Sequence, residues 1–167
     1  MTDGVAVIGL GNAMRRDDGV GPAVASAVEA CAIPGVRVVT DAVDPIRIID
    51  AWAGASLAIV VDAAVTSTPV PGRIHRCTGA QVSSAPTMSS HGMSLPAVLA
   101  LGEALDRVPQ TLVLFAVEAA DTGYGEGLTP DVAAAVPCAA AAVAEEIARG
   151  SFGRDGGAQM PWPGDAR

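Results

Sequence analysis

The stretch Val5-Ala-Val-Ile-Gly-Leu-Gly-Asn12 decides how this chain folds, because an apolar run passes directly into a glycine-rich turn. An apolar run bounded by turn residues is typical of a short buried strand, here Val5 to Ile8. Apolar residues between Gly19 and Ala32 then recur at helical spacing, which predicts a helix with one face against a sheet. A strand, a glycine turn and a helix together indicate the opening unit of an α/β protein.

The same alternation continues to about residue 150. We expect further strands at Val36 to Thr40, Leu57 to Val61 and Thr111 to Val117, and a short edge strand at Gly72 to Cys77. Helices are expected from Pro45 to Trp52 after an Asp44 cap, from Leu95 to Arg107 after a Ser94 cap, and from Thr129-Pro130 to near Gly150. Pro137 should kink or split the last of these helices.

These elements predict a doubly wound α/β fold. Near-continuous apolar strands joined through helices favour a largely parallel, twisted sheet of about five strands, with helices on both faces. The length of 167 residues is that of one domain, which we place at residues 1–150. Glycine, proline and small polar residues dominate after that, so residues 151–167 are expected to form a flexible C-terminal tail without a catalytic role.

Composition and charge exclude several functional classes. The formal net charge of −8 argues against binding of a nucleic-acid backbone. All ten basic residues are arginine, so Schiff-base lysines and the Walker lysine are absent. No apolar run approaches the roughly 20 residues of a membrane span and no signal-like segment is visible, so we expect a soluble, cytoplasmic protein. The three cysteines form no CxxC pair and are expected to be buried, reduced thiols.

Three candidate metal ligands lie where an α/β protein gathers its site residues. Ligands of doubly wound folds bind beyond the carboxyl ends of the strands. Asp18 is expected in the loop after the first strand, Asp62 directly after the third, and His91 before a later helix. Two carboxylates and an imidazole suit a borderline divalent cation with open coordination positions. Asp41, which follows the second strand, falls at the same edge and could support the ligands from outside the site.

Each candidate has an ordinary alternative. Asp18 could cap the first helix, Asp62 could hold a turn, and His91 could be a polar loop residue. Asp17 could replace Asp18 as the ligand, since the sequence does not determine the direction of either side chain. Asn12, the only asparagine, is a possible supporting residue of the site, or it could simply support the glycine turn. The second histidine, His75, is expected to be exposed on the edge strand.

Nucleotide binding is a rival hypothesis. Gly9-x-Gly11 after a strand, with an acid after the second strand, belongs to the dinucleotide-binding fingerprint. Met14, however, occupies the position of the third glycine, where a side chain obstructs close packing of helix and strand. Asp17 and Asp18 would also repel a pyrophosphate, although the neighbouring arginines offset part of that repulsion.

Four ordered motifs carry a resemblance to a known family. The segment Gly9-Leu-Gly-Asn-Ala-Met-Arg-Arg-Asp-Asp-Gly-Val-Gly21 resembles the N-terminal signature of the [NiFe]-hydrogenase maturation proteases. Val60-Val-Asp-Ala-Ala64 resembles the strand of that family that ends in an aspartate, and Ser89-Ser-His-Gly-Met-Ser-Leu95 its histidine segment. Gly127-Leu-Thr-Pro-x-Val132, with a proline in the helix that follows, resembles the C-terminal pattern. The resemblance covers roughly Val5 to Arg149.

The resemblance implies an endopeptidase that removes a C-terminal extension from the hydrogenase large-subunit precursor after nickel insertion. The metal ligands proposed for the family map onto Asp18, Asp62 and His91 of this sequence. The resemblance implies that these residues are also the catalytic groups. Nickel could be carried by the substrate, and another divalent cation could take its place. The chain departs from the family pattern in two places. Asp18 is shorter than the glutamate of some members, and Ala42-Val43-Asp44 replaces a common Gly-Gly after Asp41.

Two mechanisms and one further class of function stay open. A bound ion could polarise the scissile carbonyl or activate a water, or the ion could only dock the substrate while a carboxylate acts as general base. A nickel-dependent docking or chaperone module would use the same three ligands without cleaving the precursor. No HExxH helix and no GxSxG turn is present, so the common protease classes fit poorly. Arg15 and Arg16 are either solvated or in contact with an acidic stretch of the precursor.

Overall fold

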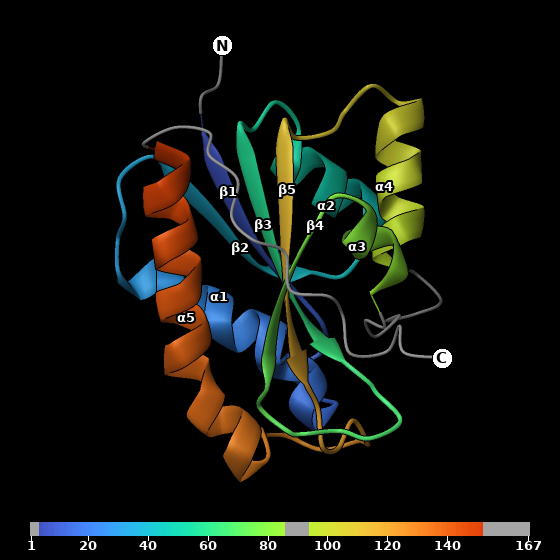
Figure 1. Ribbon diagram of the computed structural model, residues 1–167, viewed down its shortest axis with the longest axis vertical. Helices are drawn as coiled ribbons and strands as arrows, with labels where there is room; N and C mark the ends of the chain where they lie inside the picture. The colour runs from blue at the N-terminus through green and yellow to red at the C-terminus, as the bar shows by residue number, and fades with distance from the viewer. Residues whose placement is uncertain (1–3, 86–93, 152–167) are drawn as a thin grey trace.

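The computed structural model describes residues 4–85 and 94–151 and is built on one five-stranded sheet (Figure 1). The strands lie in the order β2-β1-β3-β5-β4. Their bounds are Val5–Leu10 for β1, Val36–Ala42 for β2, Leu57–Ala64 for β3, Ile74–Thr78 for β4 and Thr111–Glu118 for β5. All neighbouring strands are parallel except β4, which pairs with β5 in the antiparallel sense. The predicted single-domain, doubly wound α/β sheet is confirmed.

Helices cover both faces of this sheet (Figure 1). One layer holds α1 (Val20–Ala30) and α5 (Pro130–Ser151), and the other holds α2 (Pro45–Trp52), α3 (Ala80–Ser84) and α4 (Leu95–Ala104). A separate apolar cluster fills the space between the sheet and each layer. Successive residues of a strand point to opposite faces, so each central strand contributes to both clusters. Within the described residues, no helix has the length and apolar character that a membrane crossing requires.

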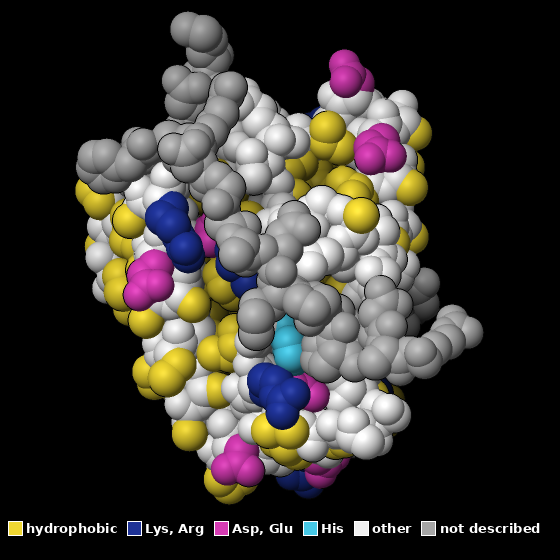
Figure 2. Space-filling model, viewed as in Figure 1, with side chains coloured by type: hydrophobic (Ala, Val, Ile, Leu, Met, Phe, Trp, Pro, Cys, Tyr) yellow, Lys and Arg dark blue, Asp and Glu magenta, His cyan; other side chains and the backbone are white. Residues whose placement is uncertain are grey.

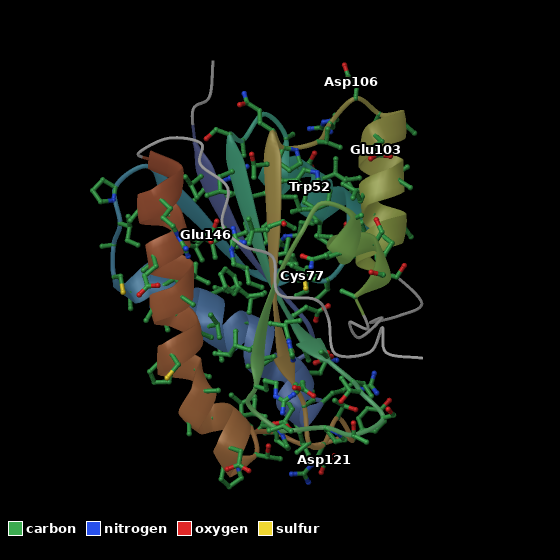
Figure 3. All side chains as sticks on the ribbon, in the orientation of Figure 1. Trp52, Cys77, Glu103, Asp106, Asp121 and Glu146 are labelled. Carbon is green, nitrogen blue, oxygen red and sulfur yellow. The ribbon has the colours of Figure 1, made fainter. Side chains whose placement is uncertain are left out.

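Two polar contacts join helices to more distant parts of the chain, and Figure 3 labels the helical residue of each, Trp52 and Glu146. Trp52, fully buried at the end of α2, donates its indole N–H to the backbone oxygen of Arg107 at 2.9 Å. Arg76 on the edge strand β4 binds both carboxylate oxygens of Glu146 on α5, at 2.7 and 2.9 Å. This pair lowers the pKa of Glu146 and fastens the end of the sheet to α5.

Both predicted helix caps are present. The side chain of Asp44 accepts a hydrogen bond from the backbone N–H of Arg47 at 2.9 Å, and Pro45 occupies the first turn of α2. Ser94 accepts one from Ala97 at 3.4 Å at the start of α4. Local capping chemistry therefore predicts where these helices begin.

Some predicted boundaries are wrong. A 3-10 turn, η1 (Arg16–Gly19), precedes α1, and the short helix α3 was not expected. Asp62 lies inside β3 and not after it, because β5 pairs with every residue of that strand up to Ala64. Pro137 is predicted to kink or split α5, and the continuous helix excludes the split. Apolar packing of α5 on both sides of the proline offsets the missing backbone hydrogen bond.

The cysteines are only partly as expected. All three are free thiols, but only Cys77, on β4, is buried. Cys31 follows the last turn of α1 and Cys138 lies on α5, and both are exposed. Ala30 and Ala32, the neighbours of Cys31, are exposed as well. Cys138 is exposed although Ala139 beside it is buried, because successive helical residues lie about 100° apart around the axis.

Candidate functional site

The first loop is held close to the sheet by two glycines. A Cβ on Gly21, in the first turn of α1, would collide with the backbone oxygens of Leu10 and Val61. A Cβ on Gly9 would likewise meet the backbone of Gly21. The start of α1 therefore approaches the carboxyl ends of β1 and β3 more closely than any side chain allows. This approach brings the residues that precede α1 next to the end of β3.

Asn12 shapes the turn between β1 and η1. Its side-chain oxygen accepts the N–H of Met14 at 2.9 Å, and its backbone oxygen accepts the N–H of Arg15 at 3.0 Å. The interpretation of Asn12 as a turn residue is confirmed. Its own N–H donates to Oδ2 of Asp18 at 2.9 Å. Asp18 does not cap α1, because the cap position is Gly19 and no side chain accepts a hydrogen bond there.

Asp17 is fully buried and ties the first loop to the β5–α5 loop, residues 119–129. Its Oδ1 accepts the N–H of Thr129 at 2.7 Å, and its Oδ2 accepts the N–H groups of Ala120 and Asp121 at 2.9 and 3.0 Å. The Thr129 hydroxyl donates to the same carboxylate. Burial alone would raise the pKa of Asp17, but these hydrogen bonds outweigh it and lower the pKa. Donors surround this carboxylate, so the alternative that Asp17 is the ligand gains no support.

Asp18 and Asp62 form a pair of buried carboxylates. Asp18 has no exposed surface, and Asp62 is 2% exposed within β3. One oxygen of Asp62 accepts the N–H of Ala63 at 2.8 Å. Burial raises the pKa of Asp62 well above its ordinary value, and the nearby charge of Asp18 raises it further. Two acids far apart in the sequence thus lie near enough for the charge of one to act on the other.

The remaining candidate residues cannot be placed. His91 lies outside the described residues, and so does the side chain of Asp41, whose backbone belongs to β2. Within residues 4–85 and 94–151, no three His, Cys, Asp or Glu side chains are grouped as a metal site requires. The expected convergence of two acids and one imidazole is therefore seen only for the two acids.

The chemistry of the two acids is suited to a cation. Two ionised carboxylates placed together away from water repel one another, and either a shared proton or a bound cation relieves that repulsion. Carboxylate oxygens bind divalent metals, and one histidine would add the nitrogen donor that a borderline ion such as Ni²⁺ accepts. Asp18 and Asp62 therefore fit the predicted ligand set.

Another buried carboxylate, which sequence analysis missed, lies on β5, the strand next to β3. Glu118, at the end of β5, is 2% exposed and accepts hydrogen bonds from Thr66 at 3.0 Å, Val70 at 3.3 Å and His75 at 2.9 Å. Burial would raise the pKa of Glu118, but these hydrogen bonds lower it. The rule that singled out Asp62, an acid that ends an apolar strand, applies equally to Glu118.

His75 is not an exposed edge-strand residue as expected, since only 14% of its side chain is accessible. In the sheet register, His75 on β4 and Asp62 on β3 both lie opposite Ala116 of β5. Both therefore occupy the same row of the sheet, on the face covered by α2, α3 and α4.

The nucleotide hypothesis gains no support from the first loop. A pyrophosphate in a fold of this class sits at the turn after β1 and the start of the first helix. Asp17 and Asp18 are both buried at this point, where two carboxylates oppose a phosphate.

Comparisons with known proteins agree on one family. The model of the hydrogenase maturation protease family, HycI, matches residues 23–146, well over half of the chain. This match begins after the first loop, so it does not include Asp18. A comparison with curated proteins gave no significant match.

Solved structures share the fold. The hydrogenase maturating endopeptidase HybD from Escherichia coli is 22% identical, with a TM-score of 0.77, over 87% of this chain and 93% of its own. The [NiFe] hydrogenase maturation protease HybD from Thermococcus kodakarensis is 25% identical, with a TM-score of 0.69, over 87% and 99%. The hydrogenase 2 maturation peptidase from a Thaumarchaeota archaeon is 22% identical, with a TM-score of 0.61, over 86% and 97%.

Proposed function

The chain belongs to the hydrogenase maturation protease family and is a peptidase; on this premise we propose that it removes the C-terminal extension of a [NiFe]-hydrogenase large-subunit precursor after nickel has been inserted. The observation that carries the proposal is the pair of buried carboxylates, Asp18 and Asp62, at the carboxyl edge of the sheet. The name of the Thermococcus kodakarensis structure supports a [NiFe] hydrogenase as the class of substrate.

In this proposal nickel marks a precursor that is ready for cleavage. Asp18, Asp62 and His91 bind the ion, which arrives with the large subunit, so the extension is cut only after metal insertion. Nickel carried by the precursor is then part of the substrate. Another divalent cation of similar ligand preference could occupy the same donors.

The two acids also supply the groups that the hydrolysis needs. A bound ion polarises a carbonyl and lowers the pKa of a water molecule. If the ion only docks the substrate, Asp62 is the carboxylate suited to accept the proton of the attacking water, because burial and the charge of Asp18 raise its pKa. Asp18 contributes by its charge, which helps to raise that pKa. Burial excludes bulk water from the pair and strengthens its electrostatic effect.

Cleavage of purified precursor tests the proposal. The protein is incubated with nickel-loaded and with nickel-free precursor, and the mass of the large subunit is measured. Loss of a C-terminal peptide from the nickel-loaded form alone is expected. Binding of the loaded precursor without any change of mass would instead identify a docking or chaperone module, and calorimetric heat with NAD or ATP would support nucleotide binding.

Substitution of the proposed ligands tests the site. Asp62→Ala and His91→Ala are each expected to abolish cleavage while the circular dichroism spectrum stays native. Asp50→Ala is the control, because Asp50 is an exposed aspartate that pairs with Arg107 on the surface. This variant should cleave the precursor normally. Full activity of either ligand variant would count against this site.

A further inference from the structure

Exposed apolar side chains are concentrated at one edge of the molecule. Among the described residues, eight large hydrophobic residues are exposed, and six of them lie at or just after the loops that follow the carboxyl ends of parallel strands. We name these six the apolar rim: Met14 after β1, Val43 and Ile46 after β2, Val65 and Val70 after β3, and Tyr124 after β5. The other two, Leu101 and Leu105, belong to α4 and its C-terminal end.

The apolar rim lies at the same edge of the sheet as the carboxylate pair. Parallel strands end at a common edge, and Asp18 and Asp62 lie at that same edge. The loop after β5 reaches across to the loop after β1, where Gly125 pairs with Arg15, so the rim residues Tyr124 and Met14 lie together. The loops after β3 and β5 run side by side at the lower end of Figure 1.

Three of the four loops that carry the apolar rim, those after β1, β3 and β5, are held by hydrogen bonds. The N–H of Gly125 donates to the backbone oxygen of Met14 at 2.9 Å, and the N–H of Arg16 donates to that of Gly125 at 2.9 Å. The buried carboxylate of Asp17 joins the same two loops, and the carboxylate of Glu118 accepts the N–H of Val70 in the β3–β4 loop. Apolar side chains on a rigid frame lose little entropy when a partner binds.

Two arginines at this edge already face carboxylates. Arg16 lies 3.4 Å from Asp121, and Arg73 lies 3.4 Å from the buried Glu118. Figure 2 shows hydrophobic side chains among acidic and basic ones at this lower end of the molecule. Cations that already face carboxylates on the same surface have little attraction left for an acidic segment. The surface around the two acids therefore favours an apolar partner.

We propose that the apolar rim binds an extended, apolar segment of the protein substrate beside the peptide bond that is cut. This inference rests on the proposed function and adds where, and by which chemistry, the precursor docks. A rim contributed by four loops spans the edge of the sheet, as a polypeptide partner requires. Exposed apolar residues gathered on one surface mark such interaction sites, whereas single ones scattered elsewhere carry no such meaning.

Binding to an inactive variant tests the proposal without relying on cleavage. In the Asp62→Asn background, the affinity for nickel-loaded precursor is measured for the additional substitutions Met14→Ser, Ile46→Ser and Tyr124→Ser. Each is expected to weaken binding about tenfold, as the loss of a well-packed interface residue does. Leu105→Ser is the matched control, since Leu105 is 48% exposed compared with 54% for Met14 and Ile46, but lies at the opposite edge of the sheet. It should bind like the parent.

In the active protein, the same rim substitutions should raise KM about tenfold with little change in kcat, because they remove binding that substrate and transition state share. Circular dichroism and thermal unfolding confirm that each variant is folded. Unchanged precursor affinity in all three variants would overturn the proposal. So would a change confined to the oligomeric state, measured by analytical ultracentrifugation, because the rim would then bind a second copy of the chain.

The two proposals can fail separately. If the unsubstituted protein binds the precursor through the apolar rim but does not cleave it, the docking inference stands. The proposal that this precursor is the substrate of the peptidase then fails. If cleavage occurs normally and rim substitutions leave KM unchanged, the docking inference fails alone.

Discussion

Adjacent residues Asp17 and Asp18 have different surroundings although both are fully buried. Both carboxylate oxygens of Asp17 accept backbone N–H groups of the β5–α5 loop, those of Ala120, Asp121 and Thr129. These hydrogen bonds fasten the β5–α5 loop to the first loop. Asp18 accepts the N–H of Asn12. Asp18 also lies close enough to Asp62 for its charge to raise the pKa of the Asp62 carboxyl group. One residue therefore holds the loop, and its neighbour faces the proposed site.

We expect Asp17→Asn to lower the free energy of unfolding by about 1–3 kcal/mol. An amide group would direct its own N–H groups at backbone donors that now bind a carboxylate oxygen, leaving buried groups without a partner. Urea denaturation followed by circular dichroism measures this change.

Asp62→Asn is the contrasting substitution at the residue scale. Because burial and the charge of Asp18 already disfavour ionisation of Asp62, an uncharged amide of the same shape should keep or increase stability at neutral pH. Cleavage should nevertheless be lost. Equal destabilisation by the Asp17 and Asp62 substitutions would contradict the division of roles between these residues.

The β3–β4 loop, residues 65–73, is held in place by one residue at the end of β5. Glu118 accepts hydrogen bonds from Thr66 and Val70 of this loop, and the backbone N–H of Gly72 donates to the backbone oxygen of Glu118 at 2.9 Å. A buried carboxylate at the end of β5 therefore determines the conformation of a loop that carries two residues of the apolar rim.

Glu118→Ala should release this loop. With the carboxylate removed, the N–H of Val70 loses its acceptor, and amide hydrogen exchange of residues 65–73 should become faster. Glu146→Ala is the matched control, because it breaks the pair with Arg76 on the other face of β4 and leaves the loop contacts intact. Unchanged exchange after Glu118→Ala, or equal acceleration in both variants, would refute this role of Glu118.

Buried carboxylates also set how the whole molecule responds to acid. The pKa values of Glu118 and Glu146 lie below their ordinary value of 4.5 in the folded protein. A depressed folded pKa adds stability that is fully present above the unfolded pKa and is lost as the pH falls through the folded pKa. The free energy of unfolding should therefore fall as the pH is lowered below about 4.5.

Denaturation by urea across pH 3 to 7 checks this expectation. Glu118→Gln should be less stable than the unsubstituted protein at pH 7, and its stability should fall less steeply below about pH 4.5 because one linked proton is missing. Parallel curves for the two proteins would show that Glu118 has the same pKa in the folded and unfolded states.

Much of the fold follows from local patterns in the sequence. Apolar periodicity, the caps at Asp44 and Ser94 and the order of strands and helices predict the doubly wound sheet, because each depends on residues a few positions apart. The same order places Asp18 and Asp62 at one edge, since parallel strands end together. Asn12 is likewise recognised as a turn residue from its immediate neighbours.

Other features depend on residues that meet only after folding. Whether Asp17 is saturated depends on Ala120, Asp121 and Thr129, over a hundred positions away. The extension of β3 past Asp62 depends on pairing with β5, and the burial of His75 depends on Glu118. Hydrogen bonding, burial and pKa respond to whatever lies nearest in space, and chain order does not specify those neighbours. Local sequence patterns therefore predict the fold and the position of the acids. Only the surroundings of each acid in the folded protein distinguish Asp17, which holds a loop, from Asp18, which faces the proposed site.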